Sequence, residues 1–131
     1  MNYQTALINL YYLLINVDGK VEERELAIGK NIVKMEGINP TVFDDQMEKL
    51  LTKDTDALYR ECVTRLKGLT LAQQVRSIAW LCITANSDGF MDKQEWQLIY
   101  NLYNIELKLD LAEILKMQKV ILSENQKKSV A

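Results

Sequence analysis

The sequence predicts an all-α protein: a single compact domain of about seven helices, arranged as two pseudo-symmetric halves. Three observations support this prediction. Apolar residues recur at helical spacing along most of the chain, the single proline and five glycines are few for a protein rich in turns, and one phrase occurs twice. At 131 residues the chain fits one domain, and a domain of this size buries roughly two-thirds of the surface that its unfolded chain exposes.

The repeated phrase runs from Asn16 to Leu26 and again from Asn86 to Trp96. Both copies follow the pattern N-x-D-G-x-Φ-[ED]-x-x-E-Φ, in which Φ is apolar, and corresponding positions lie 70 residues apart (88 minus 18). Agreement at polar and apolar positions together is hard to obtain by chance, so we interpret the chain as a duplicated helix-loop-helix unit. The two halves and the helix that connects them are expected at about 1–52, 70–123 and 55–67.

The first helix is expected from about Asn2 to Val17. It is apolar on nearly every side, so other helices must enclose it, and its length and leucine content favour helix over strand. The segment lacks a positively charged leader and a cleavage site, and it is shorter than the ~20 residues that a bilayer span requires. We therefore expect a buried core helix and no membrane insertion.

Capping residues and glycines delimit the next three helices. The second is expected to end at Glu36, because Gly37 can adopt the positive φ that often follows a helix. Asn39 and Pro40 begin the third, since asparagine caps a helix and proline loses no hydrogen bond at the first helical position. The fourth is expected to end at Gly68.

Two capping boxes mark the later helices. Thr70-Leu71-Ala72-Gln73 opens the fifth helix, which duplicates the first and is equally suited to the centre of the fold. A sixth helix follows the second copy of the phrase, and Asp110-Leu111-Ala112-Glu113 opens the seventh. With no strand signal or linker, these helices predict one all-α domain over 1–123, followed by a polar tail at 124–131.

Charge and composition exclude several functional classes. The net charge is −2, and the basic residues are scattered without a stripe, so nucleic-acid binding has no electrostatic footprint. The chain has no histidine, and it lacks a serine-centred elbow and a glycine-rich phosphate loop, which argues against the common catalytic motifs. Cys62 and Cys82 lie in apolar helical patterns and are expected to be buried, reduced thiols of a cytoplasmic protein.

Three carboxylates occupy matching positions in each of the two acidic segments, residues 16–25 and 86–95. They are Asp18, Glu22 and Glu25 in the first segment, and Asp88, Asp92 and Glu95 in the second. A purely structural explanation covers most of them. With Glu22 or Asp92 as N-cap, the glutamate three residues later completes a capping box. The glycines allow a sharp turn, and the aspartates before them can cap that turn.

The alternative explanation is a site for a hard divalent cation. Aligned with the calcium loop of an EF-hand, each glycine takes position 6, and Glu25 or Glu95 takes the bidentate position 12. The first position breaks the match, because Leu14 and Thr84 stand where an EF-hand has a carboxylate. An ordinary pair of EF-hands is therefore not expected, whereas a divalent-cation or acidic interaction site stays open.

The doubled D-G-x-Φ-x-x-x-E phrase, in a helical chain of about this length, resembles the TerB-like domain family of bacterial tellurite-resistance proteins. The resemblance covers the chain from the first helix to the seventh. It implies a non-enzymatic binding or scaffolding module of the bacterial cytoplasm, acting in tellurite resistance or stress response, whose acidic segments bind a divalent cation (Ca²⁺ or Mg²⁺) or a protein partner. Carried over by position, the site residues are Asp18, Glu22, Glu25, Asp88, Asp92 and Glu95.

Physical chemistry limits what this resemblance can mean. Tellurite is an oxyanion, and segments dense in carboxylates would repel it, so any contribution to resistance would be indirect. The first copy also departs from the pattern, because Glu22 stands where a shorter capping residue is more usual.

Two other functional classes remain open. A degenerate EF-hand-like protein would respond to calcium by exposing apolar surface. An enzyme could use pairs of carboxylates as acid and base, with or without a bound metal.

Overall fold

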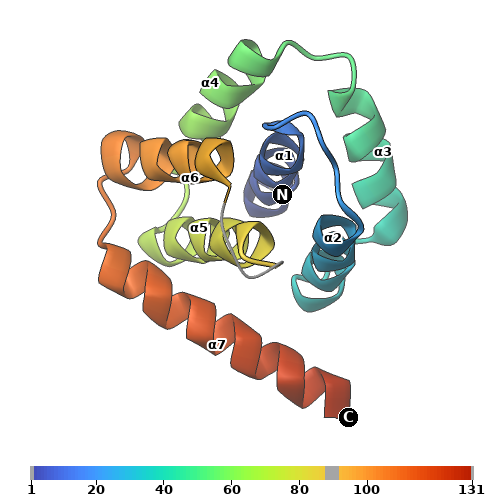
Figure 1. Ribbon diagram of the computed structural model, residues 1–131, viewed down its shortest axis with the longest axis vertical. Coiled ribbons are helices and arrows are strands. Elements are labelled where there is room, and N and C mark those ends of the chain that lie inside the picture. The colour runs from blue at the N-terminus through green and yellow to red at the C-terminus, as the bar shows by residue number, and fades with distance from the viewer. Residues whose placement is uncertain (1, 88–91, 131) are drawn as a thin grey trace.

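The computed structural model describes residues 2–87 and 92–130, and side chains within 3–87 and 92–125. The described residues form seven α-helices and no strand, as the sequence predicts (Figure 1). A π-helical turn, η1, follows the sixth helix. The elements in chain order are α1 (Asn2–Asn16), α2 (Glu23–Met35), α3 (Pro40–Leu50), α4 (Thr55–Lys67), α5 (Leu71–Ala85), α6 (Lys93–Tyr100), η1 (Asn101–Glu106) and α7 (Leu111–Val130).

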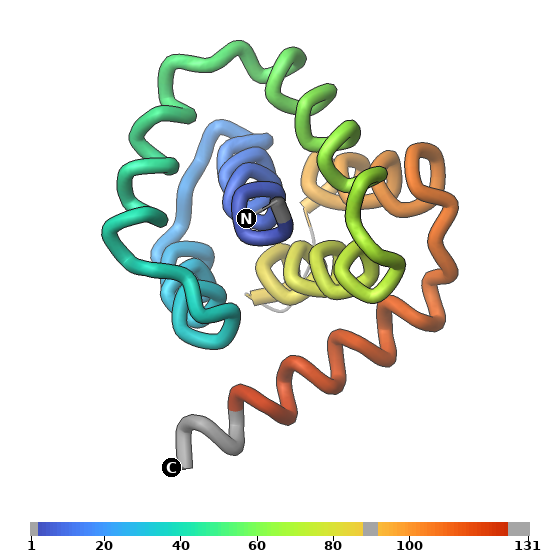
Figure 2. Tube along the Cα trace, turned by 180° about the vertical axis from the view of Figure 1, so that it is seen from behind, coloured from blue at the N-terminus to red at the C-terminus, as the bar shows by residue number. Residues whose placement is uncertain are grey.

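Helix α1 lies at the centre with α2 to α6 around it, and α7 lies on the outer side of α5 (Figures 1 and 2). It packs against α3, α4, α5 and α6, while α5 packs against α1, α2, α6 and α7. Leu10 and Leu14 of α1 are fully buried, as are Ile78 and Leu81 of α5. The expectation that these two apolar helices form the core is confirmed.

The capping residues work largely as expected. Asn39 Oδ1 accepts hydrogen bonds from the amides of Thr41 at 2.8 Å and Val42 at 3.3 Å, and Pro40 is the first residue of α3. Thr70 and Gln73 form the reciprocal capping box that opens α5. These local bonds fix where the helices begin, and hence the lengths of the turns between them.

The last helix differs from the expectation in two ways. Segment 124–131 was expected to be a polar tail, but α7 continues through it to Val130. At the start of α7, Asp110 accepts a hydrogen bond from the amide of Ala112 at 2.9 Å, as a capping residue does. The carboxylate of Glu113, the second member of the expected capping box, instead lies 3.8 Å from the ammonium of Lys116. Among the described helices, none combines the length and apolar content that a bilayer crossing needs.

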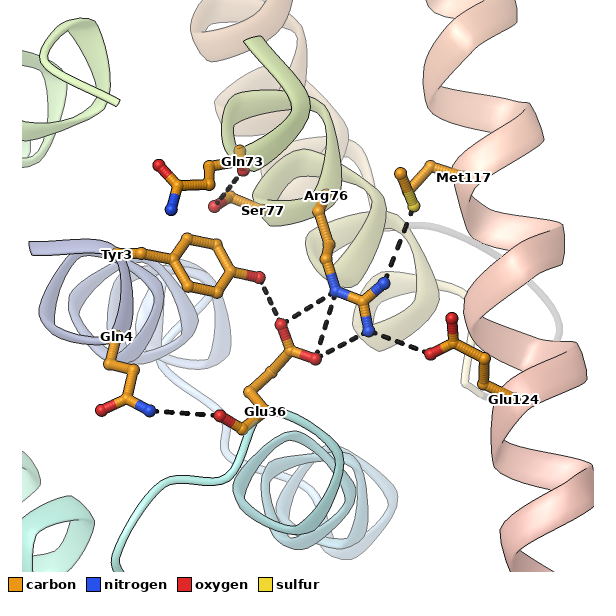
Figure 3. A network of polar contacts seen from close by, with 8 residues as sticks. All are labelled: Tyr3, Gln4, Glu36, Gln73, Arg76, Ser77, Met117 and Glu124. Carbon is orange, nitrogen blue, oxygen red and sulfur yellow. Dashed lines mark hydrogen bonds and ion pairs between the residues drawn. The ribbon is translucent and has the colours of Figure 1, made fainter. Parts of the chain in front are cut away.

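A polar network ties four helices together (Figure 3). Arg76 of α5 donates to both carboxylate oxygens of Glu36, which follows the last residue of α2, at 2.7 and 2.9 Å. Tyr3 of α1 donates to the same carboxylate. Arg76 also reaches Glu124 of α7 at 3.2 Å. The network therefore holds α7 and the C-terminal end of α2 in place relative to the core.

Both cysteines are expected to resist thiol reagents in the folded protein. Cys62 and Cys82 are free and buried, and burial raises their pKa to about 12 and about 11, respectively. The thiolate is the reactive form, so reaction with Ellman's reagent at about pH 8 should be slow in native buffer and complete in concentrated guanidinium. Rapid reaction of either thiol in the native protein would contradict its burial.

Candidate cation site between the acidic segments

The first acidic segment, residues 16–25, turns sharply at the end of α1. Gly19 has a φ of 78°, a left-handed conformation that glycine adopts without a steric penalty. Its amide donates to the carbonyl of Asn16 at 3.1 Å, and Asp18 Oδ1 accepts from the amide of Lys20 at 2.9 Å. The turn directs the chain from the core helix α1 to the more exposed helix α2.

Both acidic segments also cap the helix that follows them. Glu25 Oε1 accepts from the amide of Glu22 at 3.0 Å, and Asp92 accepts from the amide of Gln94 at 2.9 Å. Asp88 lies outside the described residues. The structural explanation of the repeated carboxylates is therefore partly correct, since Asp18, Glu25 and Asp92 each accept a backbone hydrogen bond.

The fold brings carboxylates of both segments together. Asp18, Asp92 and Glu95 each offer an oxygen atom, and these three oxygens lie within 4.8 Å of one another. The residues come from different halves of the chain and meet because α1 and α5 pack side by side. They line a cavity of about 180 Å³, here called the acidic cavity, whose walls also include Lys20, Glu22, Glu25, Thr84, Ala85 and Ser87. Five of the six residues predicted from the sequence thus share one cavity.

The environment of Glu95 is the most unusual feature of the acidic cavity. Glu25 and Glu95 are each only 6% exposed, and Glu95 Oε2 has no hydrogen-bond partner among the described residues. Burial, the adjacent carboxyl of Glu25 and the charges of Asp18 and Asp92 raise the pKa of Glu95 to about 8. Glu95 therefore retains a proton near neutral pH unless a cation offsets the surrounding negative charge.

The donor atoms suit a hard cation. The clustered groups are carboxylates, and Ca²⁺ binds oxygen ligands at about 2.3–2.6 Å. Two oxygens on one Ca²⁺ can then be no farther apart than about 5.2 Å, and the three clustered oxygens fall within that limit. The residues present fit a divalent cation without a large rearrangement.

The arrangement differs from an EF-hand pair. Leu14 is buried within α1, and Thr84 lies within α5 with its hydroxyl donating to the carbonyl of Trp80 at 2.8 Å. The side-chain amide of Asn16 donates to the carbonyl of Tyr12 at 2.9 Å. In the part of the chain that is described, the two segments contribute to one shared cluster, whereas the EF-hand alignment implies a separate ion in each loop.

Thr84 and Ser87 also line the acidic cavity but were not expected there, because Ser87 occupies a variable position of the repeated phrase and Thr84 lies two residues before it. Comparisons of the chain with models of protein families, with curated proteins and with solved structures found no match. The geometry and charge of the acidic cavity, together with the repeated phrase, are therefore the features of this protein that bear on its function.

Proposed function

We propose that this protein is a non-enzymatic, TerB-like binding module whose two acidic segments hold one divalent cation between them. A single observation carries the proposal: Glu95 is buried with an unpartnered carboxylate oxygen, and it faces three other carboxylates from both halves of the chain. Buried carboxylates are costly unless they are paired, protonated or bound to a metal. A cation would provide the missing counter-charge.

Helix capping alone does not explain this arrangement. Backbone amides account for Asp18, Glu25 and Asp92, but a cap does not require glutamates from two helices to face each other. Such an approach raises the energy of the ionised pair. A role that benefits from concentrated negative charge explains why the carboxylates face one another.

Calcium suits the acidic cavity better than magnesium. Ca²⁺ accepts six to eight oxygen ligands in irregular geometry, whereas Mg²⁺ usually retains several waters and binds through only one or two carboxylates. The three clustered carboxylates, with Glu25 and Glu22 on the same wall, would supply more protein ligands than Mg²⁺ usually takes. By bridging the two halves, the ion would stabilise the folded domain as any ligand specific to the folded state does.

The size of the acidic cavity argues against an enzyme. Sites for small organic molecules typically enclose about 300–1,000 Å³, and this cavity of about 180 Å³ is smaller. A larger hollow of about 580 Å³ lies between α1, α4 and α6, but among its lining residues Asp56 is the single carboxylate. Cation binding or the docking of a basic partner side chain is therefore favoured over acid–base catalysis. Through the TerB-like resemblance, we place the module in bacterial stress response or tellurite resistance.

Calorimetric titration of the metal-free protein should show one Ca²⁺ bound per chain, with Mg²⁺ binding more weakly. Asp18→Asn removes a clustered charge and should weaken Ca²⁺ binding by about 10-fold or more, because affinity depends on the charge of the ligands. Asp45→Asn makes the same chemical change on the exposed face of α3, and it should leave the affinity unchanged.

Two outcomes of the titration would contradict this proposal. Two equivalent calcium ions per chain would favour the EF-hand-like alternative. Absence of heat with Ca²⁺, Mg²⁺ and Mn²⁺ at millimolar concentrations would reduce the segments to helix caps or to a docking point for a basic partner.

A further inference from the structure

Helix α2 is joined to the core helix α1 by an unusual contact close to the acidic cavity. The hydroxyl of Tyr11 donates to the backbone carbonyl of Glu25 at 2.7 Å, and this bond is buried. Tyr11 itself is 1% exposed. The tyrosine thus bonds to the backbone of a residue whose side chain lines the cavity.

Gly29 makes this contact possible. It lies one helical turn after Glu25, so both residues lie on the same side of α2. A Cβ atom added at Gly29 would lie 2.7 Å from the ring carbon Cζ of Tyr11, and closer still to its hydroxyl oxygen. Any larger residue would therefore push α2 away from α1 or displace the tyrosine ring.

The repeat shows that a tyrosine and a glycine are not the only solution at these positions. Adding 70 to each number gives Leu81 and Ile99 in the second half, and both are fully buried. Two aliphatic side chains therefore fill the corresponding positions there. The first half instead carries a hydroxyl and a glycine, and the hydroxyl bonds to the residue that faces Glu95.

Helix α3 also restrains the Tyr11 side chain. Phe43 of α3 lies on the ring, with the two ring centroids 6.0 Å apart. These contacts restrict the movement of the Tyr11 ring, so the hydrogen bond from its hydroxyl fixes the position of α2 relative to α1.

We propose that Tyr11 and Gly29 are positioning residues of the cation site: together they set the distance between α1 and α2 and so place Glu25 opposite Glu95. This inference rests on the proposed cation binding. Neither residue lines the acidic cavity. Their effect is indirect, in the way that residues outside the ligand set orient the ligands of other metal sites.

The test separates cation affinity from stability. Tyr11→Phe removes only the hydroxyl and should weaken Ca²⁺ binding about 10-fold, whereas Gly29→Ala moves the helix and should weaken it about 100-fold. Ile32→Val is the control, because Ile32 is a buried residue of the same helix and its truncation loosens packing without altering the tyrosine contact. Affinity is measured by calorimetry, and stability by urea unfolding in the absence of cations.

A double variant makes the test decisive. Tyr11→Leu with Gly29→Ile copies into the first half the pair found in the second half. It should be more stable than Gly29→Ile alone, because leucine makes room for isoleucine, but its Ca²⁺ affinity should remain reduced. If every variant lost affinity only in proportion to its loss of stability, as Ile32→Val would, the positioning role would be excluded. Wild-type affinity in Tyr11→Phe would also overturn it, and absence of binding by the wild type would overturn the proposed function itself.

Discussion

Replacing Glu95 by glutamine is expected to stabilise the cation-free protein above neutral pH and to abolish Ca²⁺ binding. The glutamine keeps the shape of the side chain but carries no charge, so it removes the repulsion from Glu25, Asp18 and Asp92 that raises the pKa of Glu95. The gain should be about 1–3 kcal/mol at pH values near and above the raised pKa. Urea unfolding in a chelator measures the stability, and calorimetry measures the binding.

The pH dependence of stability follows from the same group. The pKa of Glu95 rises from 4.5 to about 8 on folding, so the folded state keeps a proton that the unfolded state releases between these values. Its contribution to stability is present below about pH 4.5 and is lost as the pH rises through about 8, with a slope of at most about 1.4 kcal/mol per pH unit. The wild type in chelator should therefore lose stability between about pH 5 and 8 and change little above that range.

Saturating Ca²⁺ should flatten this dependence, because the ion offsets the ionised carboxylates. Glu48→Gln is the matched control: the same change at an exposed position of α3 should preserve both the pH dependence and the affinity. Destabilisation by Glu95→Gln at about pH 8, or retained Ca²⁺ binding, would show that Glu95 acts only as a helix residue with no special electrostatic role.

The helices could be predicted from the sequence because their signals are local. Asn39 and Thr70 form hydrogen bonds within three residues of themselves, and such bonds depend little on the rest of the fold. The central helices were equally predictable, since a helix that is apolar on all sides has to be enclosed.

The end of α7 could not be predicted in the same way. Its last residues are polar, and the sequence alone suggested a tail after residue 123. Glu124 instead meets Arg76 from 48 positions away, and such a pairing leaves no periodic trace. Leu115 and Leu122 are 47% and 43% exposed, so the apolar residues of α7 are also more numerous than its contact with α5 requires.

For the candidate site, too, the features that depend on neighbouring residues could be predicted from the sequence, and those that depend on contacts between distant residues could not. The carboxylates were identified from their repetition, and their capping bonds from their spacing. Their convergence in one cavity depends on how α1 and α5 pack, which the sequence does not state. The contact between Tyr11 and Gly29 was missed as well, although comparison of the repeats could have marked it, because Leu81 and Ile99 replace these residues in the second half.

Replacing Arg76 by methionine is expected to destabilise the protein strongly. The Glu36 side chain is only 4% exposed. Although burial alone would raise its pKa, the hydrogen bonds from Arg76 and Tyr3 outweigh this effect and lower it. Without the guanidinium, a buried carboxylate loses its counter-charge, which costs about 3 kcal/mol or more. Chemical unfolding at neutral pH measures the loss.

Two companion variants separate this buried pair from its exposed neighbour. Glu124 is 45% exposed, so Glu124→Gln should cost less than about 1 kcal/mol. Adding Glu36→Met to Arg76→Met removes the unpaired buried charge and should recover much of the loss, since apolar pairs often replace buried ion pairs at little cost.

The lowered pKa of Glu36 also predicts how stability depends on pH. The contribution of Glu36 to stability is present above its ordinary pKa of 4.5 and is lost as the pH falls below that value. In Arg76→Met, burial should dominate and raise the pKa of Glu36. Protonation of Glu36 in mild acid should therefore recover part of the stability that this variant loses at neutral pH. Equal losses in the Arg76 and Glu124 variants would show that the network acts through surface charge, with the buried pair contributing little.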